Sequence, residues 1–114
     1  MEKENTRQQK IARQIQKDLG EMLGRELANL VRGAMVTVTE VRMSPDLEYA
    51  RVWVSVFPFE WHGVIMASLE ANNWRIRKVL GAKVRNQMRV VPELTFALDD
   101  SFEYVEKIDN LLNK

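Results

Sequence analysis

The chain has 114 residues, of which 46% are hydrophobic and 29% charged, and this ordinary usage excludes wholesale disorder. Its 17 basic and 16 acidic residues give a net charge of +1, so a charged binding surface must come from how the charges are distributed. The lack of cysteine excludes disulfides and thiolate metal sites. We expect one cytoplasmic domain over residues 1–114, because the sequence shows no secretory signal and no apolar run of membrane-spanning length.

The first predicted element is an amphipathic helix from Thr6 to about Leu30, with Thr6 and Gln9 as a candidate capping box. Gly33 stands where a helix C-terminal glycine is expected. The internal Gly20 and Gly24 weaken this helix unless they allow close packing on a sheet. The apolar residues recur at intervals of three and four: Ile11, Ile15, Leu19, Met22, Leu23, Leu27 and Leu30.

Two strands are predicted next, Met35–Met43 and Tyr49–Phe57, because both segments alternate and are rich in β-branched residues. The segment SPDLE between them has turn chemistry and predicts a hairpin. In the second strand, three valines face the core and three residues face outward. The inward set is Val52, Val54 and Val56, and the outward set is Arg51, Trp53 and Ser55.

After a loop over residues 57–63, helix is predicted from Val64 to about Gln87, with a break at Asn72-Asn73 or at Gly81. A last strand is predicted from Val90 to Leu98. Because proline lacks an N–H group, Pro92 indicates an edge strand, and a blunted edge favours a monomer.

Asp99, Asp100 and Ser101 offer N-caps to a short C-terminal helix. Its apolar residues are Val105, Ile108, Leu111 and Leu112. The resulting order is α-β-β-α-(α)-β-α, an α+β domain with its helices on one side of a small sheet.

Basic residues concentrate in two segments. Between Arg75 and Arg89 there are six basic residues and no acid, whereas six acids and two lysines follow from Glu93 onward. On an ideal helix, four of the six fall within an arc of about 80°: Arg75, Lys78, Arg85 and Arg89. The first helix adds Arg7, Lys10, Arg13 and Lys17. This pattern is typical of a phosphate-binding surface, and a plainly solvated helix face is the alternative.

Signals for catalysis are weak. His62 has neither a partner nucleophile nor metal-ligand spacing, and we expect a surface residue in a loop. Asp99 and Asp100 could bind Mg²⁺, but adjacent acids before a serine are more typical of a helix start. Three tryptophans are candidates for stacking on bases or for burial: Trp53, Trp61 and Trp74.

Two motifs resemble the ribosome-binding factor A family: SPDLEYARVWVSVF and RVVPELTFALDDS, in this order and separation. The first helix with Arg13, the segment VTVTEVRMSPDL and the segment IRKVLG are similar to it as well. The resemblance covers about residues 7–112.

The resemblance implies a type II KH-like domain with the order α-β-β-α-α-β, a three-stranded sheet, helices on one side and an added short C-terminal helix. It implies a non-enzymatic factor, without cofactor or metal, that binds the free small (30S) ribosomal subunit. It further implies late maturation and processing of 16S rRNA, a link to growth in the cold, and an assembly GTPase as a further partner.

By similarity, the candidate RNA-binding residues are Arg7, Lys10, Arg13, Arg75, Arg77, Lys78, Arg85 and Arg89. The motif residues are expected to shape the fold and its turns: Ser44, Asp46, Leu47, Pro92, Glu93, Leu94, Phe96 and Asp99. The chain departs from the family before Ile76, where the sequence reads ANNWR and lacks the glycine of the family's Ala-x-Gly kink.

Two other functions fit parts of the sequence. One is a protein–protein adaptor that uses the acidic C-terminal helix and has no affinity for RNA. The other is a small enzyme that uses Asp99, Asp100 or His62, for which we expect no turnover of ribosomal RNA.

Overall fold

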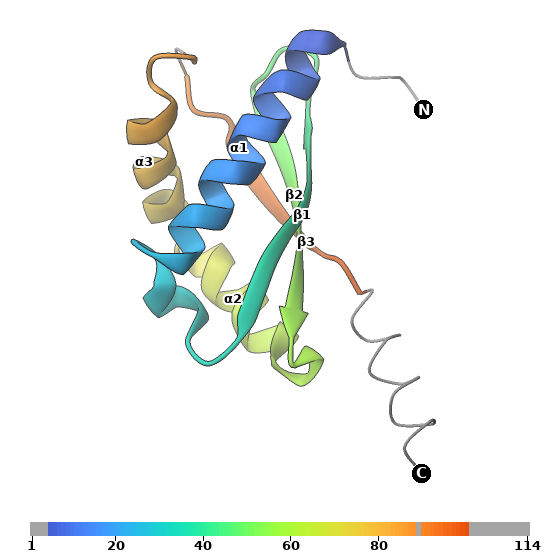
Figure 1. Ribbon diagram of the computed structural model, residues 1–114, viewed down its shortest axis with the longest axis vertical. Coiled ribbons are helices and arrows are strands. Elements are labelled where there is room, and N and C mark those ends of the chain that lie inside the picture. The colour runs from blue at the N-terminus through green and yellow to red at the C-terminus, as the bar shows by residue number, and fades with distance from the viewer. Residues whose placement is uncertain (1–4, 89, 101–114) are drawn as a thin grey trace.

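The computed structural model describes residues 5–88 and 90–100, and it confirms the expected α+β architecture (Figure 1). The elements are α1 (Thr6–Gly24), η1 (Ala28–Val31), β1 (Met35–Met43), β2 (Tyr49–Phe57), η2 (Phe59–Trp61), α2 (His62–Ala71), α3 (Asn73–Val84) and β3 (Glu93–Leu98). The helices lie on one side of the three-stranded sheet, as Figure 1 shows. The predicted C-terminal helix lies outside the described residues.

The central strand is β2, which pairs antiparallel with β1 and parallel with β3. A tight turn joins β1 to β2, whereas the parallel pairing of β3 requires the crossover that α2 and α3 provide. Val52, Val54 and Val56 are fully buried, as predicted. Ser55, which was expected to face outward, is buried too.

The first helix is shorter than its apolar pattern predicted. Leu27 and Leu30 continue the pattern, but the backbone leaves the α-helix at Arg25 and resumes as the 3₁₀ turn η1. The capping box also lies one residue earlier than expected. Asn5 Oδ1 accepts from Gln8 N, and Gln8 Oε1 accepts from Asn5 N. Asparagine is at least as good an N-cap as threonine, which explains the shift.

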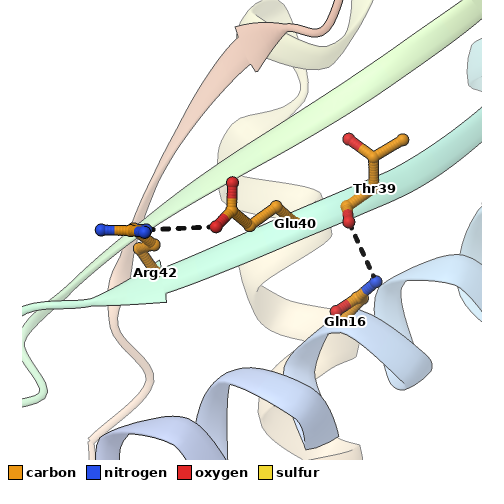
Figure 2. A network of polar contacts seen from close by, with 4 residues as sticks. All are labelled: Gln16, Thr39, Glu40 and Arg42. Carbon is orange, nitrogen blue, oxygen red and sulfur yellow. Dashed lines mark hydrogen bonds and ion pairs between the residues drawn. The ribbon is translucent and has the colours of Figure 1, made fainter. Parts of the chain in front are cut away.

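Two glutamine side chains fix α1 on β1. Gln8 Nε2 donates to the Met43 carbonyl at 3.0 Å, within the buried interface. Gln16 Nε2 donates to the Val38 carbonyl and to the Thr39 carbonyl, where a bulge interrupts the β1–β2 register. Figure 2 shows the bond to Thr39. A bulge frees backbone groups from the ladder, and Gln16 satisfies two of them.

The SPDLE hairpin is built on a hydrogen-bonded turn. Ser44 Oγ donates to Asp46 Oδ1 at 2.6 Å and accepts from Tyr49 N at 3.0 Å. Asp46 Oδ1 also accepts from Glu48 N. These bonds hold Leu47 at φ 63°, a conformation that leucine rarely adopts, while its side chain packs against the core. The motif residues of this turn therefore shape the fold, as expected.

The break in the second helical segment falls at Asn72, one of the two predicted places. Gly81 instead lies inside α3, where an added Cβ would meet Val91 Cγ2 at 2.9 Å. It permits close approach of α3 to the segment before β3. A Cβ added at Gly20 or Gly24 would have no neighbouring atom within 4 Å. The prediction that these glycines allow close packing on the sheet is therefore wrong.

The last strand is an edge strand, as Pro92 indicated, but it begins at Glu93 and not at Val90. Pro92 is fully buried immediately before it. The first ladder contact comes from Glu93 N, which donates to the Glu48 carbonyl. Because proline has no N–H to donate, the strand starts one residue after it.

Gly33→Ala should lower the free energy of unfolding by about 2–4 kcal/mol, because Gly33 has φ +76° and a Cβ there would lie 2.5 Å from the Trp61 ring. Gly20→Ala is the matched control, and it should raise the free energy by about 0.5–1 kcal/mol through helix propensity. Urea unfolding measures both. Equal effects of the two substitutions would contradict the close contact at Gly33.

Asp46→Asn should destabilise the protein at pH 7 and much less at pH 3. The Ser44 hydroxyl and the Glu48 N–H lower the pKa of Asp46 below its ordinary 3.8. A lowered folded-state pKa stabilises the fold above the unfolded-state value, and that contribution is lost as pH falls through the folded-state value. Urea midpoints across this pH range test it, with the exposed Glu21→Gln as control. A difference between Asp46→Asn and the parent that stays constant with pH would refute the assignment.

Candidate nucleic-acid interface

The solvent side of α1 carries four basic residues, all of them exposed: Arg7, Lys10, Arg13 and Lys17. At about 100° per residue they share an arc of about 120°, opposite the buried side that includes Ile15 and Leu19. The hydrogen bonds of Gln8 and Gln16 to β1 fix the rotation of the helix about its axis. This basic side therefore points away from the sheet.

The basic side of α3 is shorter than predicted. The helix ends at Val84, with Arg85 as its C-cap residue at φ −57° and ψ −24°. Since this backbone is still helical, Arg75, Lys78 and Arg85 keep the predicted arc, opposite the buried Ile76, Leu80 and Val84. Arg89 lies outside the described residues, and the idealised helix that placed it in the same arc does not extend to it.

Arg77 is engaged within the protein. Its Nε donates to the Pro92 carbonyl at 3.1 Å and its Nη2 to the Val91 carbonyl at 3.0 Å. The half-buried guanidinium thus ties α3 to the segment that enters β3. Helical angle could have found this, because Arg77 falls about 160° away from Arg75 around the helix.

Six of the other candidate cations have no carboxylate partner among the described residues. Within residues 5–88 and 90–100, the two ion pairs are Arg42–Glu40 and Lys83–Glu26. Lys83 bonds Glu26 at 3.0 Å, and the backbone N–H of Glu26 together with the Lys83 ammonium lowers the pKa of that carboxyl. In this part of the chain, no carboxylate pairs with the remaining candidates, which are Arg7, Lys10, Arg13, Arg75, Lys78 and Arg85.

The two basic segments meet where α1 begins and α3 ends. A cleft of about 320 Å³ lies there. It is lined on one side by Arg7 and Lys10 of α1 and on the other by Val84, Gln87 and Met88. Arg85 belongs to the same stretch of chain. The cations that line this cleft are therefore Arg7 and Lys10 of α1, and Val84, Gln87 and Met88 form the uncharged wall opposite them.

The three tryptophans have different environments. Trp53 is half-buried on the far face of the sheet, with the Arg51 guanidinium 5.7 Å from its ring centroid. Trp61 packs over Gly33. Trp74, in the first turn of α3, is exposed over 68% of its surface.

The residues considered for catalysis do not form a catalytic arrangement in the described part of the chain. His62 lies in the first turn of α2 and not in a loop; its Nδ1 donates to the Phe59 carbonyl and its ring stacks on Phe59. Asp99 N donates to the Val54 carbonyl beside β2. Among the described residues, no three acidic, histidine or cysteine side chains gather as metal ligands do, and none of the described helices is long and apolar enough to span a bilayer.

A three-stranded sheet with the order α-β-β-α-α-β, helices on one side and cations on their solvent faces defines a class: a KH-like domain of type II with a basic helical surface. The family model described as ribosome-binding factor A matches residues 7–112. The chain therefore belongs to the ribosome-binding factor A family.

Relatives of the same name cover nearly the whole chain. The ribosome-binding factor A of Flavobacterium psychrophilum is 44% identical over 96% of this chain and 85% of its own length. That of Cytophaga hutchinsonii is 36% identical over 97% of this chain and 84% of its own length.

Solved structures agree with the fold. The crystal structure of ribosome-binding factor A from Thermus thermophilus matches with a TM-score of 0.66 and 25% identity, over 80% of this chain and 94% of that one. A homology model of the Thermus thermophilus protein, fitted into the cryo-EM map of a 30S complex, matches with a TM-score of 0.61 and 26% identity, over 78% of this chain and 91% of that one.

Arg77→Ala should lower the free energy of unfolding by about 2 kcal/mol, because two carbonyls lose a charged donor. Arg77→Lys should restore little of this, since an ammonium cannot reproduce the guanidinium fork. The neighbouring exposed Lys78→Ala is the control and should stay within about 0.5 kcal/mol of the parent. Chemical denaturation measures all three, and equal stability of the two alanine variants would contradict the structural role of Arg77.

Proposed function

We propose that this chain is a ribosome assembly factor that binds the free small (30S) ribosomal subunit and assists late maturation and processing of its 16S rRNA. It acts in the cytoplasm as a single KH-like domain over residues 1–114 and as a monomer. It works by binding, without catalysis, and an assembly GTPase is a further partner. The family membership and the 30S complex of the Thermus thermophilus relative support this proposal.

The observation that carries the RNA contact is the set of six basic side chains on α1 and α3 that no described carboxylate neutralises. Arg89 is added from the sequence alone. Arg77 contributes indirectly, since it holds the segment between α3 and β3. No acid lies between Glu70 and Glu93, so the approach of a phosphate to α3 meets no like charge from this stretch.

The recognition is electrostatic and depends on shape. Ordinary KH domains clamp single-stranded RNA with a Gly-x-x-Gly loop, and this chain has none. Cations fixed on two packed helices instead match the phosphates of folded rRNA. Contact with about five or six phosphates gives a plot of log affinity against log salt with a slope of about −4 to −5.

Lys78→Glu with Arg85→Glu should weaken binding to purified small subunits by about a hundredfold at about 0.1 M salt, since four units of charge change on one face. Titration with fluorescently labelled protein measures the affinity, and circular dichroism checks the fold. As a control, the loss of affinity for the single variant Lys78→Glu is compared with that for Arg51→Glu. Arg51 lies on the side of β2 that faces away from the helices. Equal losses for these two single variants would show that total charge, and not this surface, governs binding.

A further inference from the structure

Trp74 is an exposed tryptophan on a helix that packs by its other side. Its exposed fraction is 68%, against 40% for Trp61, which packs over Gly33. Single exposed apolar residues are common on protein surfaces, so exposure alone assigns nothing. The neighbours of the ring decide what it suits.

Those neighbours are cations. Trp74, Lys78 and Arg85 follow one another at spacings of four and seven, which places them within about 40° on the solvent side of α3. Arg75 is the next residue along the chain, and no acid lies between Glu70 and Glu93. An exposed indole at the edge of a row of positive charges suits a ligand that combines an aromatic ring with negative charge.

The backbone that presents Trp74 is anchored on both sides of the α2–α3 break. Asn72 Nδ2 donates to the Ser68 carbonyl at 2.8 Å, and Asn73 Nδ2 donates to the Leu94 carbonyl of β3 at 2.9 Å. The first ties the break to α2 and the second ties α3 to the sheet. The indole therefore starts from a fixed backbone, which lowers the entropic cost of binding.

We propose that Trp74 stacks on one unpaired base of ribosomal RNA, while Lys78 and Arg75 bind the flanking phosphates. This rests on the proposed function and adds a base contact to a surface otherwise made for phosphates. Stacking accepts any base, since every base has a π-face. The row of cations, with no acid between Glu70 and Glu93, favours a polyanion such as RNA over a protein partner.

The test measures the affinity of purified small subunits for three variants over a range of salt concentrations. Trp74→Ala should weaken binding about tenfold, and by the same factor at every salt concentration, because stacking releases no counterions. Trp74→Phe should retain most of the affinity, and Trp74→Leu should behave like alanine. The control Lys78→Ala should instead change the slope of log affinity against log salt by about 0.7–0.9.

A second arm identifies the contacting molecule. A benzoylphenylalanine residue placed at position 74 should crosslink to an unpaired rRNA nucleotide when the complex is irradiated, and the same residue at position 51 should not. Crosslinking from position 74 to a ribosomal protein, or to nothing, would overturn the proposal. So would parent-like binding by Trp74→Ala, or equal losses for the phenylalanine and alanine variants. The proposed function fails separately, if the parent protein does not bind small subunits or if charge reversal on α3 leaves binding intact.

Discussion

The burial of one face of β2 is the constraint on which the molecule depends. Val52, Val54 and Val56 are fully buried, and β2 pairs with another strand on each side. The burial of these side chains along β2 therefore stabilises the fold. The described helices α1, α2 and α3 cover that one face of the sheet, as Figure 1 shows. Each helix therefore buries one side against the sheet, and charged residues can occupy its solvent side. The basic surfaces of α1 and α3 are a consequence of this layering.

Neutral side chains, and not cations, set the rotation of α1. Gln8 and Gln16 bond the carbonyls of β1, and Gln14 donates to both oxygens of the buried Asp18. A helix turned by about 100° would bring Lys10 toward the core at a high desolvation cost. Because amides fix the helix, the guanidinium and ammonium groups of its solvent side are left available to a partner. The near-zero net charge of the chain is compatible with this, because the electrostatic potential at a surface depends on which charged residues lie near it.

The sequence predicted the elements that show a regular pattern of apolar residues. It failed where a single long-range contact determines the start of an element or the role of a residue. The two hairpin strands were predicted with their observed bounds, because both segments are rich in β-branched residues and a turn segment separates them. The start of β3 was predicted at Val90 and lies at Glu93, because Pro92 has no N–H for the ladder and the carbonyls of Val91 and Pro92 accept from Arg77. Arg77 and Lys78 are adjacent basic residues in the sequence, yet one is a structural donor and the other is exposed. Composition cannot separate them, whereas the helical angle of Arg77 and its hydrogen-bond partners in the structure can.

The α2–α3 break forms a kink at a position that has no glycine. Asn72 sits at φ −109° and ψ 19°, a conformation open to any residue, so no glycine is required there. Its side-chain amide bonds the Ser68 carbonyl, and Asn73 bonds Leu94. A glycine loop lets a ligand approach the backbone closely, whereas side chains stand between backbone and ligand here. A ligand at this break would therefore meet side chains, and the largest exposed apolar one there is Trp74, with 68% of its surface exposed.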